Sequence, residues 1–418
     1  MSLAHTRRGK HDVVAVLDIG STKTVCFIAE IDGGGKPHVV GMGHQLSKGV
    51  RSGVVVDLAE VETSVMAAIH GAEKMAGRTI EQVLVNISAG GIASQMATVE
   101  LTLAGGEVTE QDVVDLVREG QRSAHGAEHT LLHSFVTRYF LDAARSVKDP
   151  RHMIGQRLGA DMHLVVAPNT LVQNRTHCLA HCHMHIEDFV VSAHASALAV
   201  LQPDEMDLGA TVMDLGGGVS SVAVFGGGKN VFMDYVPVGG MHVTNDLAQG
   251  LSTTLAGAER LKTLHGSASS SPQDEHVMID VPQFGSDDDT DDDAPLVPRS
   301  MLVGIIRPRM EEIFELLRDT LESSGMLGRC GRHVVLTGGG SQMPGVRELA
   351  TRMLGKQVRI AKPRPLPGLA DAVSGPAFAT AIGMVQHALQ PSMEVQLLAR
   401  AHKHGFLRQL WQRMLARA

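Results

Sequence analysis

Two stretches of this chain share one pattern of apolar and small positions. Residues 13–31 read VVAVLDIGSTKTVCFIAEI, and residues 209–225 read GATVMDLGGGVSSVAVF. In each stretch a β-rich apolar run ends in Asp-apolar-Gly, small residues follow, and a second β-rich run begins. This is the pattern of a strand, a tight turn and a second strand. Its repetition predicts two similar lobes.

The apolar periodicity elsewhere predicts the remaining elements. Alternating positions predict strands over 83–102 with a turn at Gly90-Gly91, over 131–141 and over 159–167, and an apolar run predicts a buried strand over 333–340 that ends in glycines. The helical period predicts helices over 109–120, 246–265, 303–323 and 376–387. The elements between the two repeats are expected to form a subdomain inserted into the first lobe.

An acidic segment interrupts the second lobe. Residues 266–300 contain SASSSPQ and a run from Asp287 to Asp293 that only Thr290 interrupts. Because neighbouring carboxylates repel one another, the segment is expected to be a solvated loop.

Composition narrows the class of protein. At 418 residues the chain exceeds the roughly 250–300 residues at which single cores stop growing, which favours two or more domains. The net charge of −8 gives no basic field for nucleic acid. The four cysteines, at positions 26, 178, 182 and 330, give no disulfide framework and indicate a reducing cytosol. No signal-peptide core and no run of 18 apolar residues is present, so any membrane contact is expected to be peripheral.

The turns of the two repeats carry candidate chemistry. Backbone N–H groups in Gly20-Ser21-Thr22 and Gly216-Gly217-Gly218 can approach phosphate oxygens closely, since no bulky side chain shields them. Lys23 adds a positive charge for phosphate. Asp18 and Asp214 are placed to hold Mg²⁺, chiefly through its retained waters. A single Asp-x-Gly turn is equally well explained as hairpin chemistry, but the duplication favours a ligand site.

A third glycine turn follows the predicted strand at 333–340. Gly338, Gly339 and Gly340 would let a nucleoside lie flat against the backbone. The sequence contains no G-x-x-x-x-G-K-[ST] and no G-x-G-x-x-G after a strand, so two common nucleotide sites are absent.

These motifs carry a family resemblance. LDIGSTKT (17–24), VMDLGGGVSSVAVF (212–225), VVLTGGG (334–340) and PAFATAIGM (376–384) resemble the phosphate-1, phosphate-2, adenosine and connecting motifs of the actin, Hsp70 and sugar-kinase superfamily. With VPVGG (236–240) and AERLKTLHG (258–266), the pattern resembles the FtsA family of bacterial cell-division proteins. The resemblance covers roughly residues 12–388 and the C-terminal tail.

The resemblance implies a fold. It is an α/β, two-lobed actin-like ATPase fold of duplicated ribonuclease-H-like domains, with an FtsA-type inserted subdomain and a C-terminal amphipathic helix. It also implies that Glu259 and Lys262 face the nucleoside. The implied segments are 12–85 and 164–200 (subdomain 1A), 86–163 (inserted subdomain 1C), 201–244 and 311–388 (2A), 245–310 (2B with the acidic loop), 389–403 (linker) and 404–418 (membrane-targeting helix).

The C-terminus has the pattern of a membrane-surface helix. From Gly405 the chain runs FLRQLWQRMLARA, and no Asp or Glu follows Glu394. The helical period places arginines, Arg413 among them, opposite an apolar face, and Phe and Trp on that face suit a membrane interface. Packing of this stripe on the protein's own core is the alternative. The apolar face comprises Phe406, Leu407, Leu410, Trp411, Met414 and Leu415.

A cluster of His and Cys residues raises a metal site as a further alternative. His177, His181 and His185 lie four positions apart, as do Cys178 and Cys182. No standard zinc spacing is present, so a variable helix surface is favoured.

The resemblance implies a function. It implies an ATP- and Mg²⁺-binding scaffold, with at most weak ATPase activity, that anchors the FtsZ ring (Z ring) at the division septum. The implied partners are the FtsZ C-terminal peptide docking near residues 245–310, further copies of the chain in an actin-like filament, later division proteins and anionic lipid on the cytoplasmic side of the inner membrane. A sugar kinase, or a pilus or rod-shape actin homologue, is the alternative, although the sequence offers a kinase no identifiable base.

Overall fold

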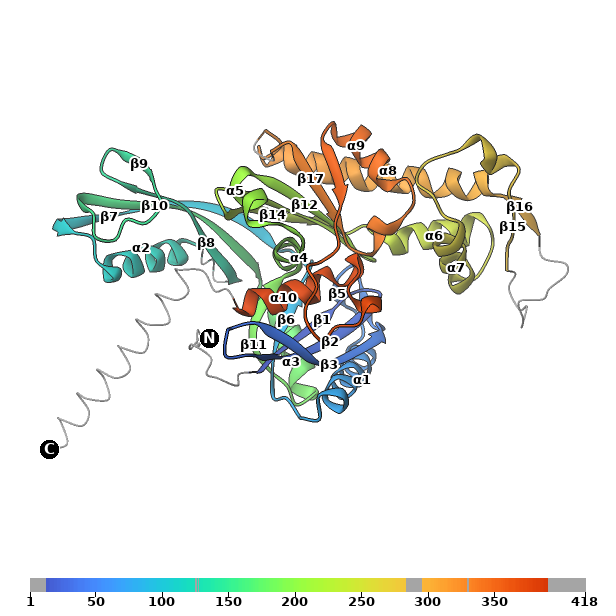
Figure 1. The fold of residues 1–418 in the computed structure, drawn as a ribbon, viewed down its shortest axis with the longest axis horizontal. Helices are drawn as coiled ribbons and strands as arrows, with labels where there is room; N and C mark the ends of the chain where they lie inside the picture. The colour runs from blue at the N-terminus through green and yellow to red at the C-terminus, as the bar shows by residue number, and fades with distance from the viewer. Residues whose placement is uncertain (1–12, 125, 127, 283–294, 329–330, 390–418) are drawn as a thin grey trace.

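Each sequence repeat forms the first hairpin of a five-stranded sheet (Figure 1). The computed structural model describes residues 13–124, 126, 128–282, 295–328 and 331–389. In the first lobe β1 (Val13–Ile19) pairs antiparallel with β2 (Lys23–Ile31), and in the second β12 (Ala210–Leu215) pairs with β13 (Ser220–Gly226). The strand orders are β11-β6-β1-β2-β3 and β18-β17-β12-β13-β14, so the two sheets share one topology. The predicted duplication is confirmed.

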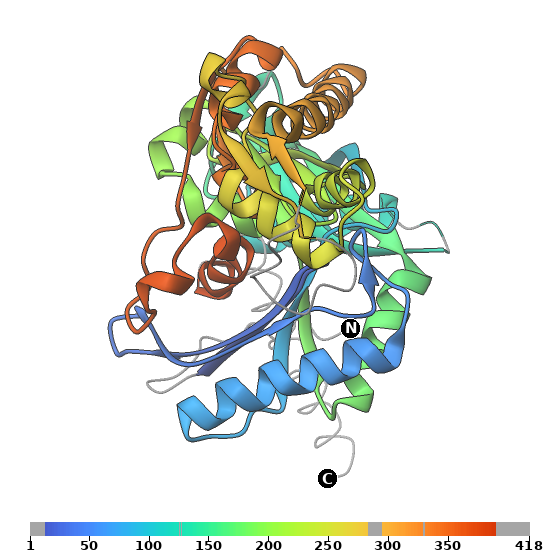
Figure 2. The same cartoon turned by 90° about the vertical axis from the view of Figure 1, so that its right-hand side faces the viewer.

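Helices cover both faces of the first sheet. α1 packs against β2 and β3, while α4 and α10 lie together between the two sheets, α10 against β1 and α4 against β12 (Figures 1 and 2). Helix α1 begins where the side chain of Asp57 accepts a hydrogen bond from the N–H of Glu60, and ends at Gly77 in the left-handed conformation. The other elements of this lobe are β3 (Pro37–Leu46), β4 (Val50–Arg51), β5 (Val54–Val55), α1 (Leu58–Ala76), β6 (Gln82–Ile87), α3 (Asn169–His181), β11 (His185–Val191), α4 (Ser192–Val200) and α10 (Ala379–Leu389).

The second lobe extends into a smaller helical subdomain (Figure 1, right). α8 extends along both parts and buries apolar residues along its length against the second core. The elements are α5 (Pro203–Leu208), β14 (Lys229–Val236), α6 (Gly240–Gly250), α7 (Leu255–His265), β15 (Met278–Asp280), β16 (Leu296–Pro298), α8 (Arg299–Ser323), β17 (His333–Thr337), α9 (Val346–Leu354) and β18 (Gln357–Ile360). Short 3₁₀ turns span Pro272–Glu275, Gly339–Gln342, Asp371–Val373 and Pro376–Phe378.

The inserted subdomain projects from the junction of the lobes (Figure 1, left). Its sheet has the order β7-β10-β8-β9 and carries one helix with a core of its own. A capping box between Thr109 and Asp112 starts that helix where the sequence predicts it. The elements are β7 (Ala93–Glu107), α2 (Glu110–Ser123), β8 (His129–Leu141), β9 (Ala144–Val147) and β10 (Ile154–Pro168).

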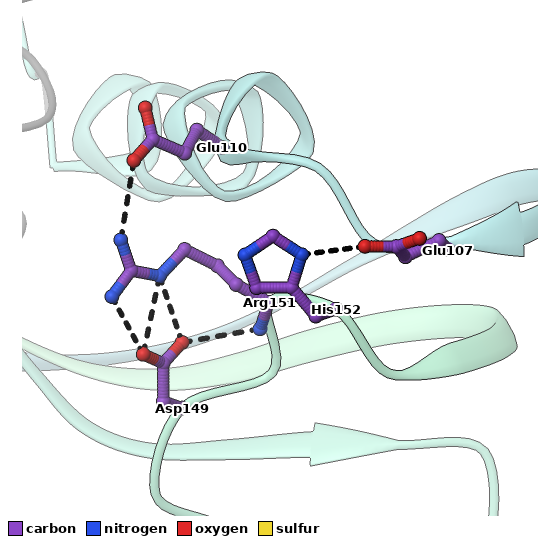
Figure 3. Close-up of polar contacts among 5 residues, drawn as sticks. All are labelled: Glu107, Glu110, Asp149, Arg151 and His152. Atoms are coloured by element: carbon purple, nitrogen blue, oxygen red, sulfur yellow. Dashed lines mark hydrogen bonds and ion pairs between the residues drawn. The ribbon is translucent and has the colours of Figure 1, made fainter.

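A polar network holds the outer end of this subdomain together (Figure 3). Arg151 donates from Nη2 to Asp149 at 2.6 Å and from Nη1 to Glu110 at 3.3 Å. His152, at a φ of 67°, places Nδ1 2.5 Å from Oε1 of Glu107. The network therefore ties the first turn of α2 to the connection between β9 and β10.

Two predictions about the second lobe are wrong in part. The helix predicted over 246–265 is two helices, because Ser252 turns with a φ of 51° and Thr254 caps a new helix by accepting from the N–H of Gly257. Part of the predicted loop over 266–300 is ordered: β15 pairs with β16, and buried Asp274 forms a 3.1 Å ion pair with Arg299.

Two predicted segments lie outside the described residues. These are the acidic run from Asp287 to Asp293 and the C-terminal stretch from residue 390, which includes the tail residues from Phe406 to Leu415. Within the described ranges, no helix combines the length and the apolar character needed to cross a membrane.

Candidate functional site

A cavity of about 580 Å³ opens between the two lobes. Every residue predicted to bind nucleotide or metal lies in its wall, so the structure brings together three turns that are far apart in the sequence. These residues are Asp18, Gly20, Ser21, Thr22, Lys23, Asp214, Gly216, Gly217, Gly218, Glu259, Lys262, Gly338, Gly339 and Gly340.

The two phosphate turns interlock across the cleft. A Cβ atom at Gly217 would stand 2.4 Å from Cγ2 of Thr22, and one at Gly218 would stand 2.4 Å from Oγ of Ser21. Neither distance leaves room for a side chain. The glycines therefore let the turn of one lobe approach the turn of the other, with their backbone N–H groups unshielded.

Asp18 is the next-to-last residue of β1 and is almost completely buried. Its Oδ1 accepts a 2.7 Å hydrogen bond from Nδ2 of Asn86, at the end of the neighbouring strand β6. Burial raises the pKa of Asp18 to about 6, and the charge of Lys23 opposes that shift. No hydrogen bond within the described residues engages Oδ2, which leaves it available to a ligand.

Asp214 occupies the matching place on β12. Its Oδ2 accepts hydrogen bonds from the hydroxyls of Ser196 on α4 and Thr380 on α10. Burial raises its pKa, and these two hydrogen bonds oppose the shift. Gly338 packs beside it: a Cβ there would stand 2.1 Å from Oδ1, and the φ of 82° also favours glycine.

Lys23 carries positive charge into the same cleft. Its Nζ lies 3.5 Å from the ring centroid of Phe378, a cation–π contact. Burial lowers the pKa of Lys23 to about 8, while Asp18 and Asp214 oppose the shift. The ammonium group is therefore held against an aromatic face, near both carboxylates.

Glu259 and Lys262 form a pair on α7. Nζ of Lys262 lies 2.6 Å from Oε2 of Glu259 and donates to Oγ1 of Thr244 at 2.8 Å and to the carbonyl of Gly240 at 3.1 Å. This links the cavity wall to the start of α6. Their contact with a nucleoside stays a prediction.

Sequence reasoning missed the residues that hold the two carboxylates. Asn86 lies near the end of the apolar strand β6, beside β1, and Ser192 begins α4 directly after the strand β11. A polar residue at the end of an apolar strand is the only sequence signal that either residue gives. Ser196 and Thr380 lie among buried apolar residues of α4 and α10, and nothing in their local sequence marks them as functional.

Sequence reasoning also missed Arg175, which supports the site from outside the cavity wall. It is 1% exposed, and its Nη2 donates to the carbonyl of Gly53 at 3.0 Å. The N–H of Gly53 in turn donates to Oγ of Ser21 at 3.0 Å. Arg175 thus supports the first phosphate turn from behind, through the β4–β5 hairpin.

The His and Cys cluster divides between two environments. His177 and His181 are exposed, with ring centroids 4.3 Å apart, whereas Cys178 and Cys182 are buried in the core of the first lobe. The interpretation as a helix surface is therefore wrong for the cysteines. Within the described ranges, no group of three or more His, Cys, Asp and Glu side chains is arranged to hold a metal ion.

Comparison with known proteins decides the family. The family model "Cell division protein FtsA" matches residues 211–383, and the "SHS2 domain inserted in FTSA" matches residues 89–166. The chain is 43% identical to cell division protein FtsA of Rhizobium meliloti, over 89% of the chain and 86% of that protein. It is 30% identical to cell division protein FtsA of Escherichia coli, over 90% of each.

The chain belongs to the FtsA family. It is therefore an actin-like cell-division protein with an inserted SHS2 domain, as the sequence motifs predict.

Solved structures agree on the actin-like fold. The PilM-PilN type IV pilus biogenesis complex matches with a TM-score of 0.63 and 18% identity, over 92% of this chain and 100% of that one. MreB5 of Spiroplasma citri bound to ADP matches with a TM-score of 0.53 and 13% identity, over 91% and 97%. At these identities the likeness establishes the two-lobed actin-like architecture.

Proposed function

We propose that the chain is a nucleotide-dependent tether, which binds ATP with Mg²⁺ between its lobes and anchors the FtsZ ring to the cytoplasmic face of the inner membrane. The observation that carries the nucleotide site is the meeting of two glycine turns and two buried carboxylates in one cleft. Membership of the FtsA family supports the role in division.

The cleft suits a polyphosphate with a divalent cation. Backbone N–H groups of the two turns and the ammonium group of Lys23 supply positive charge for the phosphates. Asp18 and Asp214 each keep one oxygen to which no described residue of the protein donates a hydrogen bond, which fits a cation that retains several waters. Asp18 and Asp214 would hold the cation, whose positive charge would offset that of the phosphates. The third glycine turn and the Glu259–Lys262 pair would border the nucleoside.

Hydrolysis in this cleft is expected to be slow. The acidic residues of the wall are Asp18, Asp214 and Glu259. The first two are assigned to the metal, and the third is paired with Lys262. No carboxylate of the described wall is left to activate water as a general base. ATP would serve mainly to hold the lobes closed, and the closed form would assemble with further copies.

The helical subdomain of the second lobe offers a surface for the FtsZ C-terminal peptide. Apolar side chains on α7, on the β15–β16 hairpin and at the start of α8 are exposed, which is typical of a docking surface. They are Leu255, Leu264, Met278, Leu296 and Met301. The basic amphipathic sequence after residue 404 supports membrane attachment and, with it, the recruitment of later division proteins.

The nucleotide site is tested by titration calorimetry with ATP and Mg²⁺. Asp214→Asn keeps the shape of the side chain and removes its charge, so we expect the affinity for ATP with Mg²⁺ to fall at least about tenfold. Asp188→Asn is the control, because Asp188 is half-buried, with a pKa that burial raises to about 6, and lies outside the cavity wall. Equal affinity for wild type and Asp214→Asn would overturn the assignment.

A further inference from the structure

Asn86 connects three groups at the floor of the cleft. It is 2% exposed, and its Oδ1 accepts a 2.7 Å hydrogen bond from the backbone N–H of Ile19. Its Nδ2 donates to Oδ1 of Asp18 at 2.7 Å and to Oγ of Ser192 at 3.1 Å. Asn86, Asp18 and Ser192 all lie in the cavity wall.

The network fixes which way the amide of Asn86 points. A backbone N–H can only donate, so the atom of Asn86 that faces Ile19 must be the carbonyl oxygen. The NH₂ group then faces Asp18 and Ser192 and donates one hydrogen bond to each. Rotating the amide would oppose two N–H donors at Ile19 and would turn a carbonyl oxygen toward a carboxylate.

This orientation also fixes the role of the Ser192 hydroxyl. A hydroxyl has one proton to donate and lone pairs that accept. Since Asn86 already donates to Ser192, the proton of Ser192 needs an acceptor elsewhere, and the described protein residues supply none. Ser192 is the first residue of α4 and lines the cavity, so that acceptor lies within the cleft.

We propose that Asn86 is a positioning residue that gives the cleft a fixed hydrogen-bond polarity, with Asp18 turned to accept and Ser192 turned to donate. The ligand atom that Ser192 meets is an anionic phosphate oxygen of the nucleotide. This inference rests on the proposed nucleotide function. It assigns Ser192 as a phosphate-binding hydroxyl, because the amide of Asn86 donates to its oxygen and leaves its proton for the ligand.

The polarity can be reversed without changing shape. In Asn86→Asp a carboxylate still accepts from Ile19 but also accepts the proton of Ser192, turning that proton away from the cleft, and it repels Asp18. We expect the affinity for ATP with Mg²⁺ to fall at least about tenfold, measured by calorimetry. Ser192→Ala should lower the affinity for ATP several-fold, and Ser192→Thr, which keeps the hydroxyl, should lower it less.

The coupling of the two residues separates positioning from a merely structural role. In the Asn86→Asp background the Ser192 hydroxyl no longer donates to the ligand, so adding Ser192→Ala should change the affinity little. Additive losses would overturn the inference. Ser64→Ala is the control for a buried hydroxyl outside the cleft, since Ser64 lies on α1 and donates to the carbonyl of Glu60. It should bind ATP as wild type does.

The outcomes distinguish this inference from the function on which it rests. Wild type that binds ATP with Mg²⁺, together with Ser192→Ala and Asn86→Asp variants that bind equally well, would leave the nucleotide site standing and overturn the roles of both residues. Wild type that binds no nucleotide would overturn both. If Asn86→Asp does not fold, the contrast between Ser192→Ala and Ser192→Thr decides, and equal losses in the two would contradict the proposal.

Discussion

Arg175 buries a guanidinium group that its surroundings satisfy only in part. Nη2 donates to Gly53, but no hydrogen-bond partner among the described residues meets Nε or Nη1. Burial lowers the pKa of Arg175 to about 10, although Cys178 and Asp18 oppose the shift. A buried guanidinium with unpaired N–H groups lowers the free energy of unfolding, but its bond to Gly53 also supports the first phosphate turn.

Arg175→Met should therefore keep or raise the free energy of unfolding, because a flexible apolar side chain replaces an unsatisfied charge. Arg175→Ala should lower it by about 2–5 kcal/mol through the cavity that it leaves. Urea unfolding of the two variants beside wild type measures both effects. A loss as large in Arg175→Met as in Arg175→Ala would show that the charge itself stabilises the fold.

The residues of the turns were predictable and their supports were not. Asp18, Lys23, Asp214 and the glycines stand in contiguous motifs that occur twice, so pattern alone identifies them. Asn86, Ser192 and Thr380 come from separate elements, and their proximity to the carboxylates is a product of strand order and helix packing. The local sequence around a single polar residue in an apolar run does not indicate which residue it contacts in the folded protein.

At the scale of elements, local signals predicted the two repeat hairpins and the helices α2, α8 and α10, and failed where tertiary contacts decide. The break between α6 and α7 depends on Ser252, which no periodicity marks. The order around Asp274 depends on Arg299, contributed by a later helix. The helix break and Asp274 both lie in the helical subdomain of the second lobe, near the acidic segment. The short strands β15 and β16 there give no periodic signal within a long polar stretch.

Four histidines meet where the inserted subdomain joins the lobes. His133 on β8, His194 on α4 and His387 on α10 have ring centroids 5.4–5.5 Å apart, and Phe135 stacks between His194 and His163 of β10. Burial lowers the pKa of His133 and His194 well below 6.5 and that of His163 to about 4. Burial therefore favours the neutral imidazole at His133, His163 and His194.

This junction should make stability depend on acid. Below pH 6.5 the histidines of the unfolded chain bind protons, whereas the buried rings of the folded chain stay neutral. The contribution of these histidines to the free energy of unfolding is therefore lost as the pH falls toward 4. The raised pKa values of Asp18, Asp188, Asp214 and Asp234 act in the opposite direction, so a variant must isolate the effect.

His194→Leu should gain about 2 kcal/mol of stability relative to wild type between pH 7.5 and pH 5. Urea unfolding at the two pH values measures the gain. His70→Leu, at an exposed position on α1, is the control and should follow the pH dependence of wild type. A His194 variant with the same pH dependence as wild type would contradict the burial of a neutral ring.

At the scale of the whole molecule, the inserted subdomain and the second lobe are directly joined. Oγ of Ser94 donates to the carbonyl of Met233 at 2.6 Å, and the N–H of Gly91 donates to the hydroxyl of Tyr235 at 2.8 Å. The close approach of the two phosphate turns is a second direct connection between the lobes. A ligand that bridges both turns would favour the closed form and so bias assembly.

The tether itself is tested most directly by sedimenting purified FtsZ with anionic lipid vesicles. With this chain, ATP and Mg²⁺ present, FtsZ should pellet with the vesicles. With Trp411→Glu it should stay in solution, because a charge then replaces the aromatic contact on the apolar face of the tail. The variant should bind ATP as wild type does. FtsZ that stays in solution while the wild-type chain and its nucleotide are on the vesicles would contradict the tether.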